Sequence, residues 1–268
     1  MHSTQRWAEL LRSATTQPGT LNKAYSLFWN YSTGNQILAL EQCRMRGIGP
    51  GPLASYRKWQ ELGRQVRSGE KAIALWMPIT IKRTKPDGEK SAGNSQGNSV
   101  GVTTAFVVRK NWFVLSQTDG KEFTPPNPPT WDRHRALAAL DVRLVRFAMT
   151  DGNCQGYAKR REIAINPVAG LPEKTMFHEI AHILLGHTGT ETMADMPTLS
   201  RNQKEMEAES VALICVESLG LPGSADARGY VQHWYGQGAE IPEANARRIF
   251  QAADRILKSG SLSQGGAQ

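Results

Sequence analysis

Four prolines fall within the seven residues of segment 124–130 (TPPNPPT), near the middle of a chain of 268 residues. Proline lacks a backbone N–H and has a fixed φ angle, so this segment can form neither a helix nor a central strand. The chain is also longer than the roughly 150 residues of a typical domain, which predicts two cores. We therefore predict domains at 1–123 and 132–258, joined by a linker at 124–131 and followed by a disordered tail at 259–268.

The two halves of the chain differ in charge. Residues 1–125 hold 17 Lys and Arg against 8 Asp and Glu, a net charge of +9, whereas residues 126–268 hold 15 against 16, a net charge of −1. This basic excess predicts a polyanionic or acidic partner for the first half. No apolar run approaches the roughly 18 residues of a membrane span, and the N-terminus does not resemble a signal peptide. With three widely spaced cysteines and no CxxC, we expect a cytoplasmic protein with no membrane partner.

The spacing of apolar residues predicts an α+β fold. We expect a mixed helix and β-hairpin domain in the first half, with a polar loop at 85–101 between the hairpin strands. The second half is expected to be helix-rich around a small sheet. Its strand at 162–166 is expected at a sheet edge, where it either aligns an extended peptide or is a plain structural strand. The predicted helices are 5–14, 33–46, 56–62, 133–140, 172–185, 204–219, 225–235 and 242–257, and the predicted strands are 72–82, 103–117, 143–150 and 162–166.

An HExxH motif, His178-Glu179-Ile180-Ala181-His182, lies on the helix predicted at 172–185. Histidines at positions i and i+4 share one helix face and can offer two imidazole nitrogens to one metal ion. Glu179 lies where a general base could take a proton from water. The motif therefore predicts a catalytic metal site, with a buried structural pair of histidines as the alternative.

A catalytic metal of this kind needs a third protein ligand. In the pattern HExxHxxGxxH the last His follows the first by ten residues, but His187 follows His178 by nine, so that pattern fails. Glu205 and Glu209 share one face of the following helix. We predict that Glu205 is the ligand and that Glu209 accepts a hydrogen bond from a ligating imidazole, with the exchange of these two roles as the alternative.

Three nearby residues receive less specific predictions. Glu207 is expected to face solvent on a charged helix face, and His187 to interact with the last carbonyls of its helix. Tyr230 could stabilise the oxyanion of a tetrahedral intermediate, with surface packing as the alternative.

These motifs resemble known families. The sequence TMFHEIAHILLGH followed by KEMEAESVALI resembles the gluzincin metallopeptidases, in which a Glu on the next helix completes HExxH. Together with GYVQHWYG and ANARRIFQAADRIL, it resembles the zincin-like peptidase domain of ArdC-type antirestriction proteins. YSTGNQIL, SYRKWQELGRQVRSGEKAIALWMP and NWFVLSQTDG are similar to the N-terminal single-stranded-DNA-binding domain of that family. The resemblance implies an antirestriction protein of a mobile element such as a conjugative plasmid.

The composition of the first half agrees with nucleic-acid binding. Residues 1–125 hold 12 of the 20 aromatic residues beside the 17 Lys and Arg. Cations can follow the phosphates of single-stranded DNA while rings stack on its bases. The alternative is that the rings are core residues and the cations only solvate the surface. From charge and motif position we nominate as DNA-contacting residues Tyr31, Arg57, Lys58, Arg64, Arg67 and Lys71.

The resulting prediction is a single-stranded-DNA-binding antirestriction protein with a zinc metallopeptidase domain, active or latent, that cleaves an unidentified protein substrate. Mn²⁺ or Co²⁺ would also accept two His and one Glu. Three alternatives stay open: a non-proteolytic DNA-binding protein with a structural metal, a DNA-associated repressor or crosslink protease, and a general cytosolic peptidase whose basic half binds no DNA.

Overall fold

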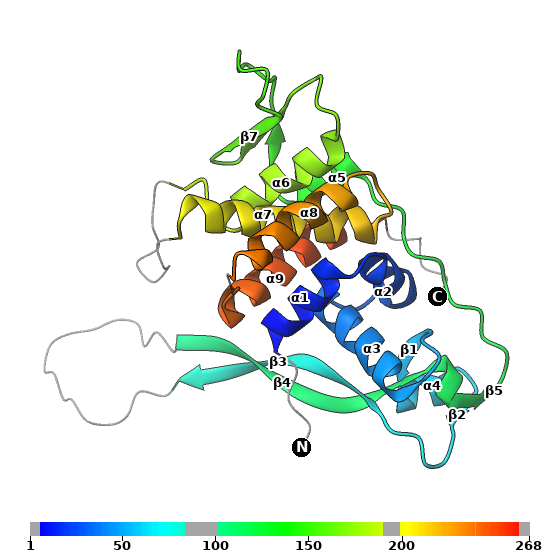
Figure 1. Cartoon of the computed structure of the whole chain (residues 1–268). Coiled ribbons are helices and arrows are strands. Elements are labelled where there is room, and N and C mark those ends of the chain that lie inside the picture. Colours follow the sequence, from blue (N-terminus) through cyan, green and yellow to red (C-terminus); the bar gives the residue numbers. More distant parts are fainter. Residues whose placement is uncertain (1–5, 84–100, 190–198, 239, 263–268) are drawn as a thin grey trace, which may run out of the picture.

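The computed structural model describes residues 6–83, 101–189, 199–238 and 240–262. Within these residues, helices occupy the centre, and three small sheets lie around them (Figure 1). This arrangement confirms the predicted α+β fold. Most of the loop predicted at 85–101 and most of the tail predicted at 259–268 lie outside the described residues.

The helices and strands of the first half are α1 (Trp7–Thr16), α2 (Thr20–Phe28), α3 (Thr33–Arg46), β1 (Leu53–Ser55), α4 (Tyr56–Glu61), β2 (Arg64–Val66), β3 (Ile73–Arg83), β4 (Gly101–Val114) and β5 (Thr118–Gly120). Those of the second half are α5 (Arg133–Ala139), β6 (Arg143–Leu144), β7 (Gly156–Lys159), β8 (Glu162–Ile165), α6 (Pro172–Leu184), α7 (Arg201–Ser218), α8 (Ser224–Gly236) and α9 (Glu243–Gly260). The predicted helices are all present, with ends that differ by at most three residues.

Helix α2 was not predicted, although its sequence carries a helical pattern. Leu21, Ala24, Tyr25 and Phe28 are spaced at i, i+3, i+4 and i+7, and all four are buried. Gly19, with a φ of 78°, precedes the helix in the left-handed region that favours glycine. Only three residues, Gln17, Pro18 and Gly19, separate α2 from α1, and α2 itself is only nine residues long.

The long antiparallel hairpin of β3 and β4 matches the predicted strands, and β1 pairs with the other edge of β4. Two predictions for the second-half sheet are wrong. The strand predicted at 143–150 is reduced to Arg143–Leu144. The strand predicted at the sheet edge, β8, lies in the middle, because it pairs with β6 on one side and β7 on the other. The edge position beside it belongs to β7, which was not predicted.

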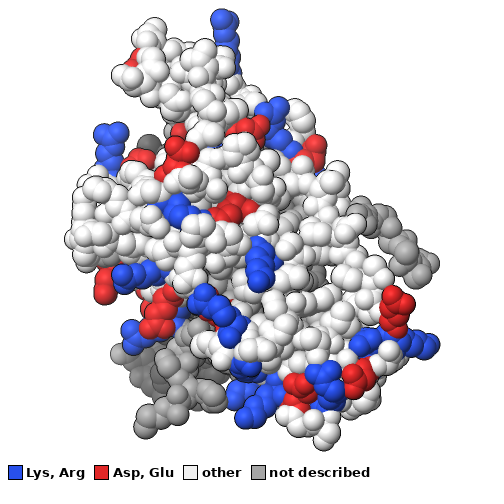
Figure 2. Space-filling model, turned by 45° about the vertical axis from the view of Figure 1, so that its right-hand side comes forward, with Lys and Arg blue, Asp and Glu red and all other residues white. Residues whose placement is uncertain are grey.

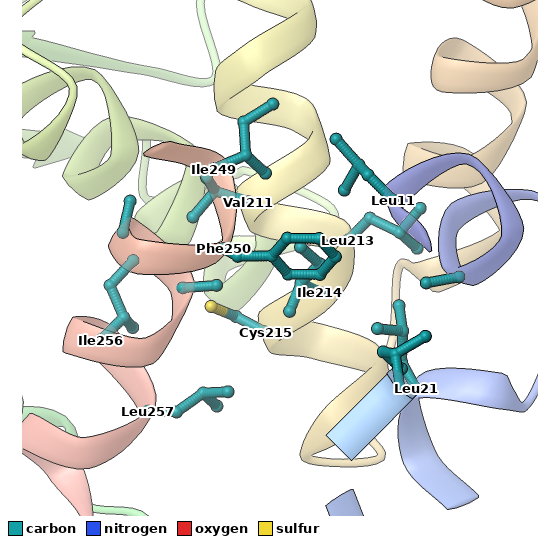
Figure 3. Packing of buried hydrophobic residues seen from close by; sticks show 14 of the residues in the cluster. Leu11, Leu21, Val211, Leu213, Ile214, Cys215, Ile249, Phe250, Ile256 and Leu257 are labelled. Atoms are coloured by element: carbon teal, nitrogen blue, oxygen red, sulfur yellow. The ribbon is translucent and has the colours of Figure 1, made fainter. Parts of the chain in front are cut away.

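The buried hydrophobic residues of the two halves form one continuous cluster rather than the two cores that the chain length suggested. Helix α7 lies at its centre, between α9 on one side and α1 and α2 on the other (Figure 3). Residues that meet there are Leu11, Leu21, Val211, Leu213, Ile214, Cys215, Ile249, Phe250, Ile256 and Leu257. The residue limits of the two domains stay a prediction.

Carboxylates of α9 cap two helices of the first half. Asp254 accepts hydrogen bonds from the backbone N and the Oγ1 of Thr33, at 2.6 and 2.7 Å, at the start of α3. Glu243 accepts from the backbone N of Trp7, at 2.9 Å, and of Ala8, at 3.3 Å, at the start of α1. A carboxylate at a helix N-terminus satisfies free N–H groups and is favoured by the helix dipole. The second half therefore completes helices of the first.

Among the described residues, no helix is both long enough and apolar enough to cross a bilayer.

These contacts predict that cutting the Pro-rich segment will not separate the halves. A variant with a specific protease site at the exposed Asn127 should, after complete cleavage, still elute as one species of the uncut size in gel filtration, because α1, α2 and α3 remain packed on α7 and α9. Separation of the two fragments under native conditions would contradict the continuous cluster. The same digest should separate fully in denaturant.

Candidate metal centre

Helix α6 holds the HExxH motif in a fixed orientation because its opposite face is packed into the core. Phe177, Ile180 and Ala181 are fully buried. Pro172 occupies the first turn, where its missing N–H removes no helical hydrogen bond, and the chain leaves the helix at Gly186 with a φ of 75°. The two histidines lie on the neighbouring face, towards α7.

His178, His182 and Glu205 come together between α6 and α7. Their ligand atoms lie within 4.8 Å of one another. The Nε2 atoms of the two histidines are 3.1 Å apart, and Glu205 Oε2 lies 3.2 Å from His178 Nε2 and 3.6 Å from His182 Nε2. Ligands placed at about 2.0–2.1 Å around a tetrahedral ion are about 3.3 Å from one another. The spacing of the three atoms therefore fits a divalent cation.

The partners at the other ring nitrogens strengthen this fit. His178 Nδ1 lies 2.9 Å from Oε2 of Glu209, and Lys174 Nζ lies 2.6 Å from Oε1 of the same carboxylate. Burial raises the pKa of Glu209, but the hydrogen bond to His178 and the Lys174 ammonium outweigh burial and hold that pKa below its usual value. An ionised Glu209 accepts the Nδ1 proton of His178. The Nε2 lone pair of His178 then points towards Glu205, as a metal ligand requires.

The charge around these imidazoles favours a cation. Burial lowers the pKa of His178, but hydrogen bonds with Glu205 and Glu209 outweigh burial and raise it to about 9. Hydrogen bonds with His178 and His182 in turn hold the pKa of Glu205 well below its usual range. A positive charge between these groups is therefore stabilised whether it is carried by a proton or by a metal ion.

Glu179 is buried beside this cluster. Burial raises its pKa, and the neighbouring His178 and His182 oppose that rise. Strand β7 approaches this side of α6 at Gly156: a Cβ on Gly156 would lie 2.7 Å from Thr175 Cγ2 and 3.2 Å from Glu179 Oε1. Glycine therefore permits the close contact between β7 and the helix that carries the motif.

Two sequence expectations near the site are wrong. Glu207 does not face solvent; its side chain is 0% exposed, because every residue of α7 from Met206 to Ser218 is buried. His187 is 3% exposed, and its ring contacts the ring of His182 and the carboxylate of Glu207 rather than the last carbonyls of the helix. Amphipathic spacing could not reveal Glu207, since α7 has no solvent face along this length.

Tyr230 of α8 lies near the acidic side of the cluster. Its side chain is 43% exposed, and burial raises its pKa with a further contribution from the charges of Glu205 and Glu209. A phenol in this position stays protonated and can donate a hydrogen bond. Its role in catalysis stays a prediction.

The six nominated DNA-contacting residues separate into two groups. Tyr31 and Arg64 are used within the fold: the Tyr31 hydroxyl donates to the carbonyl of Leu53 at 2.8 Å, and Arg64 donates to the side chain and carbonyl of Thr118 at 2.8 Å. Burial raises the pKa of Tyr31 to about 12. Both side chains therefore have a role within the fold, and their contact with DNA stays a prediction.

The other four nominated cations are more accessible. Arg57 and Lys58 of α4 are 90% and 58% exposed, and each forms an ion pair with Glu61. Arg67 pairs with Glu70 at 2.7 Å, and Lys71 is exposed. Figure 2 shows Lys and Arg side chains alternating with Asp and Glu along the lower edge of the visible face. On this face, within the described part of the chain, the basic residues do not form a continuous strip.

Comparison with known proteins finds similarity to one family, in sequence over part of the chain and in fold over most of it. Residues 3–112 match the family model described as the N-terminal domain of anti-restriction factor ArdC. Two crystal structures of the antirestriction ArdC protein from the R388 plasmid, one metal-free and one Mn(II)-bound, each superimpose with a TM-score of 0.51 at 19% identity. The match covers 95% of this chain with either structure, and 94% of the metal-free and 95% of the Mn(II)-bound chain. Residues 3–112 are therefore similar to ArdC in sequence, and the whole chain is similar to it in fold. No curated protein sequence matches it.

The family model and the solved structures cover different parts of the chain. The family match ends at residue 112, before the HExxH motif at residues 178–182. At 19% identity the solved structures extend the likeness to the fold of the second half, but not to its chemistry. The metal centre therefore depends on the geometry of its own residues.

The geometry separates the roles of Glu205 and Glu209. Glu205→Gln should abolish stoichiometric binding of Mn²⁺ or Zn²⁺, because it removes an anionic ligand. Glu209→Gln should weaken binding by about 10–100-fold, the usual effect of losing the partner of a ligating imidazole. Isothermal titration of the metal-free chain measures both. A larger loss for Glu209→Gln than for Glu205→Gln would mean that the two roles are exchanged.

Proposed function

We propose that this ArdC-like chain is an antirestriction protein that combines a divalent-metal-dependent peptidase site with a half that binds single-stranded DNA. The observation that carries the peptidase proposal is the convergence of His178 Nε2, His182 Nε2 and Glu205 Oε2 next to the buried Glu179. Three lone-pair donors at this spacing, with a carboxylate beside them, are the donor set of a hydrolytic metal site. The metal bound by the R388 ArdC structure, Mn(II), agrees with such a donor set; we propose Zn²⁺ as the metal here, with Mn²⁺ or Co²⁺ as alternatives.

The chemistry follows from the positions of the side chains. A divalent metal held by these ligands would polarise a carbonyl oxygen and lower the pKa of a water molecule. Glu179 is the general base in this proposal, since burial raises its pKa towards the pH at which it must work. The same carboxyl group then passes the proton to the leaving amine. Tyr230 donates a hydrogen bond to the developing oxyanion.

Strand β7 is the proposed guide for the peptide. Within the described residues its outer edge pairs with no other strand, and Gly156 places it against the helix that carries Glu179. An extended peptide that adds to this edge would gain main-chain hydrogen bonds and pass beside the metal ligands. This proposal replaces the guide role that the sequence suggested for β8.

The peptidase proposal is tested by Glu179→Gln. This variant should bind metal with the affinity of the wild type but lose at least 100-fold in kcat, because an amide cannot take the proton. Cleavage is measured by mass spectrometry on a library of unstructured peptides in the presence of Mn²⁺ or Zn²⁺. Glu173→Gln, at a partly exposed position in the first turn of the same helix, is the matched control and should retain activity.

The outcome also decides between the proposal and a non-proteolytic protein. If Glu179→Gln still protects unmodified plasmid DNA on transfer into a restricting host, the antirestriction effect does not need peptide hydrolysis. In that case the metal would have a structural role, and DNA binding alone would explain protection.

The DNA-binding proposal rests on the exposed cations Arg57, Lys58 and Lys71. Replacing all three by Gln should reduce the magnitude of the slope of log K against log salt for a single-stranded oligonucleotide by about 2, since each lost phosphate contact contributes about 0.7. Fluorescence anisotropy at several salt concentrations measures the slope.

The control for that titration carries the same change in charge at exposed positions of the second half, Arg133, Arg135 and Lys159. Its slope should equal that of the wild type. A wild-type chain that shows no salt-dependent binding would contradict the DNA proposal and favour a general peptidase.

A further inference from the structure

A chain of buried polar contacts extends from His182 away from the metal site. His182 Nδ1 lies 3.0 Å from His187 Nδ1, and His187 Nε2 lies 3.0 Å from Glu207 Oε2. The other oxygen of Glu207 accepts a hydrogen bond from the side-chain amide of Asn245, on α9. His187 and Glu207 are 3% and 0% exposed.

The backbone explains how His187 reaches this place. Gly186 adopts a φ of 75°, and the chain reverses there, so that the backbone N of His187 donates to the carbonyl of His182 at 2.8 Å. A residue with a side chain would be strained at this φ. The reversal places the His187 ring next to the His182 ring, with 5.1 Å between the ring centroids.

The donors and acceptors in this chain of contacts can be assigned in only one consistent way if His182 Nε2 is to bind a metal. The proton of a neutral His182 must then be on Nδ1, and it is donated to His187 Nδ1. His187 must carry its own proton on Nε2, which it donates to Glu207. Glu207 then accepts hydrogen bonds from both His187 and Asn245.

Stability of the core alone explains the buried contacts of His187 and Glu207 less well than support of His182 does. A fully buried carboxylate is costly unless it is paired, and a hydrophobic residue at position 207 would pack into the core without that cost. Within the described residues, the only ion-pair partner of Glu207 is His187, which itself contacts His182. The Glu207 carboxylate thus pairs with the His187 imidazole, and that imidazole contacts the proposed metal ligand His182.

We infer that His187 and Glu207 are positioning residues that fix the tautomer and ring orientation of His182 for metal binding. The two histidines of the motif would then be supported in different ways: His178 directly by Glu209, and His182 through a second imidazole. This inference rests on the proposed metal site, and it adds residues that neither the HExxH motif nor the acidic helix pattern identifies.

The inference is tested by metal affinity, measured without any peptidase assay. Competition with a chromophoric chelator gives the affinity for Zn²⁺, and the visible spectrum of the Co²⁺-loaded chain reports ligand geometry. His187→Leu fills the volume but removes both hydrogen bonds, and it should weaken Zn²⁺ binding by about 10–100-fold and change the Co²⁺ spectrum. His187→Gln carries an acceptor and a donor on one planar amide, and it should restore most of the affinity.

The control is Glu217→Gln, which alters another buried carboxylate of α7 whose partner is Arg228 rather than the metal site. It should lower the melting temperature of the metal-free chain but leave Zn²⁺ affinity unchanged. If His187→Leu does not fold, Glu207→Gln replaces it and should weaken Zn²⁺ binding in the same direction.

The possible results are distinguishable. A wild-type chain that binds no Zn²⁺, Mn²⁺ or Co²⁺ overturns the proposed metal site together with this inference. A wild-type chain that binds metal, with His187→Leu or Glu207→Gln binding equally tightly and giving the same Co²⁺ spectrum, overturns the inference alone. Equal losses in His187→Leu and in Glu217→Gln would also overturn it, because they would reflect general destabilisation.

Discussion

The burial of carboxylates along α7 is the constraint on which the rest of the structure depends. A carboxylate that leaves water must find a partner, because an unpaired buried charge costs several kcal/mol. Glu207 pairs with His187 and Asn245, Glu209 with His178 and Lys174, and Glu217 with Arg228. These partners come from α6, its C-terminal turn, α8 and α9. The pairing therefore fixes how those elements pack around α7.

The sequence predicted the parts of the site that depend on helical periodicity. His178 and His182 at i and i+4, and Glu205 and Glu209 at the same spacing on the next helix, are placed by local geometry alone, and the structure brings both pairs to one point. His187 and Glu207 could not be predicted in this way. Their contacts depend on a chain reversal at Gly186 and on burial of α7 from all sides, which are tertiary properties.

The same distinction applies to the fold. Long helices and the β3–β4 hairpin were predicted because their apolar spacing extends over many residues. The order of strands in the small sheet was not, since the four-residue sequence of β8 is equally compatible with an edge or a central position. For Tyr31 and Arg64, charge and ring content suggested contact with DNA, and the structure shows a role within the fold, since both side chains donate to strand carbonyls in β1 and β5. Composition does not distinguish a binding side chain from one that satisfies the backbone.

The carboxylate caps supplied by α9 also bear on how the chain folds during synthesis. Trp7 and Glu243 are 236 residues apart in the sequence, and Thr33 and Asp254 are 221 apart. A ribosome adds roughly 5–20 residues per second. The N-termini of α1 and α3 are therefore synthesised at least about ten seconds before the carboxylates that cap them. Helix α2 is likewise synthesised before α7, against which it packs. The first half leaves the ribosome with these surfaces uncovered and completes its fold only after the last helix has been made.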